Sequence, residues 1–248
     1  MLKAAWLFIR SPSKAAKAHS KAALDGNCAW IYLISTLAFM LLFWLKPFDF
    51  PDRTAPVPFE MQDLSYWLKA EFWQPVLEAG WVVFLLGFMS FFAAGSWPVR
   101  LASAVALTAA PGALIAAYVQ YNAFPYWGFA AGAALWLLPF YFLTARAGKS
   151  QWWPLINFSM GVNAIGLPIA ALLAIAVALN QADLFKGVQI AGGLWLLGAM
   201  IIGVRELSGL RLPRAFMAVL LSAFAQFALA FCLHFLGAKG VLKALFYG

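Results

Sequence analysis

The sequence predicts an all-α protein that crosses a membrane several times, and two observations lead to this prediction. Of its 248 residues, 65% are hydrophobic and 10% are charged, whereas an ordinary soluble domain is about half apolar and about a quarter charged. Apolar runs of about 20 residues, the length that a helix needs to cross the hydrocarbon core, recur along the whole chain. We therefore expect a polytopic transmembrane helical bundle.

Seven apolar runs are candidates for the spanning helices, and six is the alternative count. Most of them are separated by short turns that contain basic residues, proline or glycine. The runs cover residues 28–45, 79–96, 101–121, 126–144, 153–179, 186–204 and 213–236.

Basic residues are distributed unevenly around these runs, and this predicts the orientation because Lys and Arg accumulate in cytoplasmic loops. With the N-terminus in the cytoplasm, 11 basic residues fall inside and 6 fall outside. The expected topology is N-terminus inside and C-terminus outside. The membrane that we expect is the bacterial inner (plasma) membrane.

Residues 1–27 are expected to form a cytoplasmic segment ahead of a transmembrane domain over residues 28–248. Lys14, Lys17 and Lys21 fall on one stripe of a helix, which is typical of a basic helix lying on the anionic cytoplasmic leaflet. Within the domain, the outer loop 46–78 carries apolar residues at helical spacing. This spacing predicts an amphipathic helix that either lies in the interface or caps the outer mouth of the bundle.

Polar side chains within the apolar runs are few, and such residues are the usual indicators of a functional site in membrane proteins. Asn157 and Asn163 precede Pro168 in the same run, and a proline within a helix predicts a kink because it removes a backbone hydrogen bond. The three residues are candidates for a neutral polar pocket. Hydrogen bonding between helices is the alternative.

Catalytic, cofactor and metal sites are not expected. Cys28 and Cys232 lie in separate apolar runs, and His19 and His234 fall on opposite sides of the membrane, so no Cys/His cluster is predicted. The net charge of +8 is concentrated beside apolar runs rather than in a basic–aromatic module, which argues against a nucleic-acid partner.

Two hairpins, at residues 81–119 and 135–177, resemble each other. Each has an aromatic-rich span, a short polar turn and then a span with a central proline, Pro111 or Pro168. Internal repeats are common in membrane folds, and chance similarity between apolar segments is the alternative.

The stretch from Asp183 to Leu210, followed by Pro213-Arg-Ala-Phe, resembles the C-terminal half of Yip-type (Ypt/Rab-interacting protein) membrane domains. Phe8-Ile-Arg-Ser-Pro12 is similar to the family's N-terminal Phe-x-x-Pro element, and residues 148–168 are similar to its span with a central proline. The resemblance implies a five-span core, to which this chain adds one hairpin. It implies no catalytic residue. The resemblance also implies a role: eukaryotic members of the family look like membrane partners of Rab-type GTPases, and some bacterial relatives accompany ABC-type exporters.

The function expected from these features is that of a non-enzymatic accessory or scaffolding subunit in a larger membrane assembly. Its partners would be membrane lipids and other membrane protein subunits, for example an ABC-type exporter. The alternative is a small-molecule or lipid transporter with a neutral site at the kinked helix, and an enzyme acting on lipids ranks third. Candidate contact residues are Lys14, Lys17, Lys21, Arg205, Glu206, Arg211 and Arg214 on the cytoplasmic side, with the acidic segment 49–78 on the outer side.

Overall fold

The computed structural model describes residues 1–21, 23–46, 50, 64–93, 95–147 and 149–242. Within these ranges the regular structure is helical, as the sequence predicts. The helices group into two compact units, each built from two separate stretches of the chain. The first unit comprises residues 1–58 and 150–212, and the second comprises residues 59–149 and 213–248.

Six helices among the described residues are long and apolar enough to cross a membrane, which confirms the polytopic helical class. Their apolar segments are Phe72–Ala93, Trp97–Val119, Tyr126–Arg146, Gln151–Ala178, Ala182–Ser208 and Leu212–Phe235. The seventh candidate is α3 (Gly26–Leu45), a helix of 20 residues and therefore about 30 Å long. Its described apolar part, Gly26–Leu42, is shorter than the other six.

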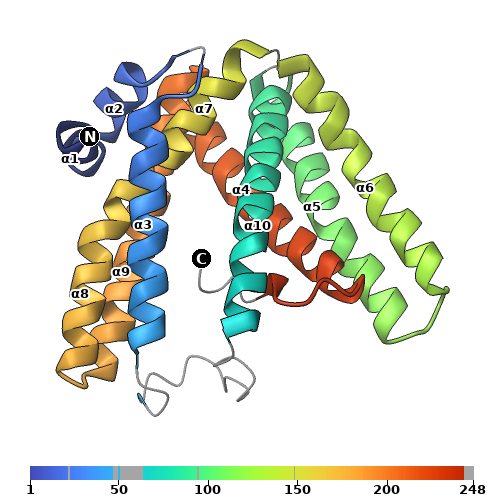
Figure 1. Ribbon diagram of the computed structural model, residues 1–248. Helices are drawn as coiled ribbons and strands as arrows, with labels where there is room; N and C mark the ends of the chain where they lie inside the picture. The colour runs from blue at the N-terminus through green and yellow to red at the C-terminus, as the bar shows by residue number, and fades with distance from the viewer. Residues whose placement is uncertain (22, 47–49, 51–63, 94, 148, 243–248) are drawn as a thin grey trace. The chain divides into compact units, whose positions relative to one another are not determined.

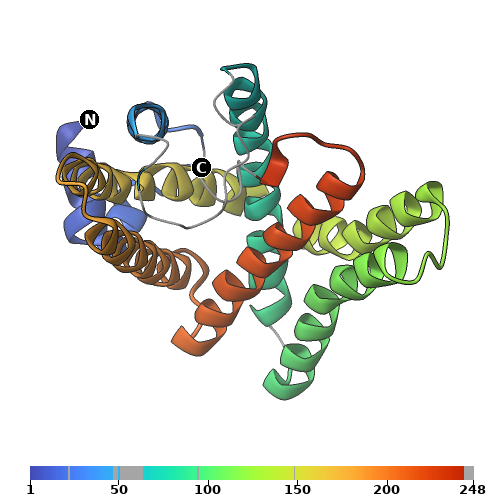
Figure 2. The same ribbon diagram turned by 90° about the horizontal axis from the view of Figure 1, so that it is seen from below.

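The first unit includes the two N-terminal helices (Figures 1 and 2). Its elements are α1 (Leu2–Arg10), α2 (Pro12–Ala18), α3, α7 (Lys149–Val162), the 3₁₀ turn η2 (Asn163–Ile165), α8 (Gly166–Ala178) and α9 (Ala182–Ser208). The N-terminal segment belongs to this unit, since α2 lies against α9. Two glycines permit close helix packing: any side chain at Gly161 would overlap the ring of Phe8, and any side chain at Gly203 would overlap the ring of Phe158.

The run predicted over residues 153–179 is interrupted where the sequence predicts a kink. The turn η2 separates α7 from α8, and Pro168 is the third residue of α8. Because proline has no backbone N–H, it cannot donate to the carbonyl four residues earlier, at Ala164 in the turn. In contrast, α5 (Trp97–Val119) runs unbroken through Pro111, so the two similar hairpins differ at this point.

The second unit contains α4 (Leu64–Ala93), α5, α6 (Tyr126–Ala147) and α10 (Leu212–Phe235). Helix α6 packs against both α4 and α5, and Figure 2 shows α5 beside α6. Phe84 and Phe88 of α4 meet Trp136 and Phe140 of α6 in an aromatic core. Elsewhere in the unit, the indole Nε1–H of Trp81 in α4 donates to the buried Ser222 Oγ in α10, at 2.9 Å.

The boundary predicted for the second run is wrong. The helix predicted within residues 46–78 is present from Leu64, but it is the first part of α4 and continues into the apolar segment as one helix, so the second run does not begin at residue 79. Charged side chains can project from a helix into solvent, and the loss of the one backbone hydrogen bond at Pro75 does not end α4. Residues 47–49 and 51–63 of the predicted outer loop, which include four of the six acids of the contact segment 49–78, lie outside the described residues.

Candidate functional site

Ionisable side chains gather where the chain enters α3, and we call His19, Lys21, Asp25 and Cys28 the N-terminal polar cluster. Asp25 is the N-cap of α3, and its Oδ1 accepts from the backbone N–H of Asn27 at 3.0 Å. An aspartate directly before an apolar run is a usual N-cap, since its carboxylate satisfies an otherwise unpaired amide. The other oxygen, Oδ2, lies 2.9 Å from His19 Nδ1 and 2.8 Å from Lys21 Nζ.

These contacts favour the ionised form of the Asp25 carboxyl. The hydrogen bond from Lys21, followed by that from His19, holds the pKa of the Asp25 carboxyl well below its usual range, against the opposing effect of burial. Asp25 in turn raises the pKa of Lys21. At neutral pH a buried carboxylate therefore faces an exposed ammonium, and the imidazole contacts the same carboxylate oxygen.

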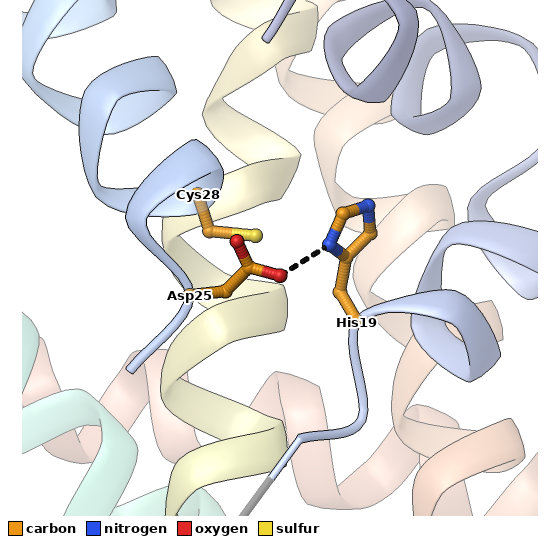
Figure 3. A group of neighbouring side chains, drawn as sticks. All are labelled: His19, Asp25 and Cys28. Carbon is orange, nitrogen blue, oxygen red and sulfur yellow. Dashed lines mark hydrogen bonds and ion pairs between the residues drawn. The ribbon is translucent and has the colours of Figure 1, made fainter. Parts of the chain in front are cut away.

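Cys28 completes the cluster from the first turn of α3. One ligand atom each of His19, Asp25 and Cys28 lie within 4.8 Å of one another. In Figure 3 the Asp25 carboxylate points toward the imidazole, and the Cys28 sulfur lies beside it. The expectation that no Cys/His cluster forms is therefore wrong for Cys28 and His19, which lie in one cluster. The spacing His19-x₅-Asp25-x₂-Cys28 differs from the C-x₂₋₄-C and H-x₃₋₅-H pairs of structural zinc sites, and the N-cap position of Asp25 was the available signal.

Asn157, in α7, stabilises the turn that leads into α3 through hydrogen bonds of its side chain. Its side chain is fully buried, and its Oδ1 accepts from the Asp25 backbone N–H at 2.8 Å. Its Nδ2 donates to the carbonyl of Ala23 at 2.8 Å and to that of His19 at 3.4 Å. One amide thus fixes the turn between α2 and α3 at three points of its backbone.

The predicted polar pocket is not assembled around a common point. Asn157 is engaged by the N-terminal turn, whereas Asn163 Nδ2 donates to the carbonyl of Ser159, four residues earlier, at 2.9 Å. Pro168 lies in the first turn of α8, directly after the turn η2 that contains Asn163. The two asparagines therefore serve different backbone segments of the first unit.

The predicted contact residues are also divided. Lys17 Nζ pairs with Glu206 Oε2 at 3.0 Å, and Lys21 pairs with Asp25. Lys14, Arg205 and Arg211 are exposed in the same unit, whereas Arg214 belongs to the second unit. Lys17 and Lys21 are therefore engaged in ion pairs within the first unit, although both side chains are exposed.

Two arginines bind the C-terminal end of α4. Arg214 Nη1 donates to the carbonyl of Phe92 at 2.7 Å, and its guanidinium lies over the Trp97 ring with 5.9 Å between Cζ and the ring centroid. Arg100 Nη1 donates to the carbonyl of Phe91. The last carbonyls of a helix lack partners within the helix and carry partial negative charge, so these cations stabilise the end of α4.

Helix α5 presents an exposed face of small residues, which we call the α5 small-residue face. Its members recur at four- and three-residue spacing: Ala102, Ala106, Ala109 and Ala113. Only 11% of the apolar segment of α5 is buried, compared with 50% in α4. In contrast, the exposed residues of α6 include leucines, tyrosines, a tryptophan and a phenylalanine, which are suited to contact with lipid.

Comparisons with protein-family models, with curated proteins and with solved structures find no match for this chain.

Proposed function

We propose that this integral membrane protein is a non-enzymatic accessory subunit of a larger membrane assembly, with its N-terminus in the cytoplasm of a bacterial cell. The observation that supports it most is the α5 small-residue face. In membranes, small residues concentrate where helices pack closely, because they let two backbones approach. A helix of a partner membrane protein fits this face better than lipid does.

The partner class follows from the Yip-type resemblance. Because some bacterial members of that family accompany ABC-type exporters, a membrane subunit of such an exporter is the first candidate. Lys14, Arg205 and Arg211 remain available on the first unit as exposed positive charges and offer a second, cytoplasmic contact.

The hydrogen bonds of Asn157 weigh against the transporter alternative, for which Asn157 is one of three candidate pocket residues with Asn163 and Pro168. Both N–H groups of Asn157 and one lone pair of its oxygen already serve the N-terminal turn. Phe8 and Phe158 contact each other in the same region of the first unit. A substrate would have to displace these hydrogen bonds, and leaving a buried polar group unpaired costs about 1–3 kcal/mol.

A pull-down from native membranes in mild detergent tests the proposal, using the full chain and the variant Ala106→Trp. We expect a membrane protein partner in stoichiometric amount with the wild type, and its loss with Ala106→Trp. The matched control, Leu138→Trp, changes an exposed position of α6 and should retain the partner.

Two results would contradict the accessory role. One is a protein that elutes alone or only as copies of itself. The other is solute movement into liposomes that contain only this protein, which would establish transport instead.

A further inference from the structure

Three side chains of the N-terminal polar cluster combine the donor types that bind zinc-like metal ions. His19 Nδ1, an Asp25 carboxylate oxygen and Cys28 Sγ lie within 4.8 Å of one another. All three residues are at least nine-tenths buried, with relative exposures of 9%, 3% and 0%. Imidazole, carboxylate and thiolate are the zinc ligands of proteins, and a thiolate disfavours Mg²⁺ and Ca²⁺.

The spacing suits a tetrahedral ion with small adjustments. Metal–ligand bonds of about 2.0–2.3 Å place ligand atoms about 3.3–3.8 Å apart. His19 and Asp25, at 2.9 Å, would separate by less than about 1 Å to meet this spacing, and the longest separation would shorten by a similar amount.

The backbone that carries two of these ligands is held in place by Asn157. The amide oxygen accepts from the N–H of Asp25, and the amide nitrogen donates to the carbonyls of His19 and of Ala23, which lies between the two ligands in sequence. Partners that orient metal ligands in this way are a regular part of metal sites. The ring of Phe8 stacks on His19 with 5.2 Å between centroids, which restricts the imidazole further.

We propose that His19 Nδ1, the Asp25 carboxylate and the Cys28 thiolate bind one divalent transition-metal ion of the zinc class. The fourth position is open to water or to a ligand from another molecule, as in sites with three protein ligands. On binding, the Cys28 thiol releases its proton to solvent and the His19 proton resides on Nε2. Lys21 leaves the carboxylate but keeps its own proton. The dication is then balanced by one carboxylate and one thiolate.

Cobalt titration of the untagged, full-length protein in detergent tests the site. We expect one Co²⁺ per chain, a thiolate-to-cobalt charge-transfer absorption, and release of about one proton per ion. Cys28→Ser should lose the absorption, whereas Cys232→Ser, which changes the other buried cysteine, should retain it. His19→Gln should weaken binding at least tenfold, with His234→Gln as its control.

A variant that binds the ion more tightly distinguishes loss of the metal site from loss of folding, because an unfolded protein would not gain affinity. Lys21 competes with the ion for Asp25, so Lys21→Met should bind Co²⁺ a few-fold more tightly, whereas Lys14→Met should not change affinity. The proposal is overturned if the wild type binds no cobalt, or if Cys28→Ser and Cys232→Ser behave alike. It is also overturned if Lys21→Met leaves the affinity unchanged.

Discussion

Asn157 shows how one buried side chain determines a local structure far away in sequence. Its carboxamide bonds three backbone groups of the turn that leads into α3, including the N–H of Asp25, which is 132 residues away. Local periodicity does not reveal such a contact, because the pairing depends on how two distant helices pack. The sequence therefore identified Asn157 as a candidate but could not assign its partners, and it missed the cluster that Asn157 supports.

The variant Asn157→Ala should destabilise the protein by about 3 kcal/mol, because it leaves buried backbone groups unpaired. Thermal unfolding in detergent measures the change. Asn163→Ala is the matched control: its amide bonds only a carbonyl of the preceding turn, so its effect should stay below about 1 kcal/mol. Equal losses for the two variants would contradict the role given to Asn157.

Asp25 should make stability depend on pH in acid. Its pKa is lowered by Lys21 and then by His19 in the folded protein, so its stabilising contribution is present above the unfolded pKa of about 3.9 and is lost as the pH falls below it. With metal removed by a chelator, the wild type should melt at a higher temperature than Asp25→Asn at neutral pH. The difference should shrink progressively below about pH 4, and a difference that persists there unchanged would argue against the carboxylate.

At the level of helices, hydrophobicity predicted the bounds of those spanning helices that have polar residues at both ends. The run predicted over 126–144 corresponds to α6 (Tyr126–Ala147), and the run over 213–236 corresponds to α10 (Leu212–Phe235). The continuity of α4 was missed, because Pro75 and nearby charges separate the helix predicted within residues 46–78 from the apolar run that begins at residue 79. Hydrophobicity shows where a helix leaves the apolar region, but the helix itself can continue into water.

Small-residue spacings illustrate the same limit. Ala199 and Gly203 are buried in the first unit, where Gly203 contacts Phe158. Gly132 approaches Leu114 between α5 and α6. These two spacings therefore serve packing within a unit, whereas the α5 small-residue face is exposed. A small-residue spacing in the sequence does not separate packing within a unit from contact with a partner, because the distinction depends on which neighbours each helix has.

The stability of the protein should depend on the guanidinium groups that bind the C-terminal end of α4. Arg214→Met removes the hydrogen bond to the Phe92 carbonyl and the favourable interaction with the helix C-terminus, so we expect a loss of about 1–2 kcal/mol in unfolding experiments. Arg211→Met changes an exposed residue nearby in sequence and should have little effect. No loss with Arg214→Met would mean that these contacts contribute nothing measurable.

For the molecule as a whole, α3 decides the topology. If α3 crosses the membrane together with the six longer spans, the two ends of the chain lie on opposite sides; if it does not, they lie on the same side. We expect α3 to cross, because its 20 residues match the bilayer core. Reporter fusions at each terminus should show the N-terminus in the cytoplasm and the C-terminus outside. Two cytoplasmic ends would remove α3 from the spans.

The accessory role depends on what covers the α5 small-residue face in the native membrane, and site-specific photo-crosslinking measures this directly. A photoreactive residue is placed at Ala106, with Leu138 of α6 as the matched position. We expect one discrete crosslink from Ala106 to a different membrane protein, and only lipid or diffuse products from Leu138. Lipid products alone from Ala106, or a crosslink only to a second copy of this chain, would contradict it.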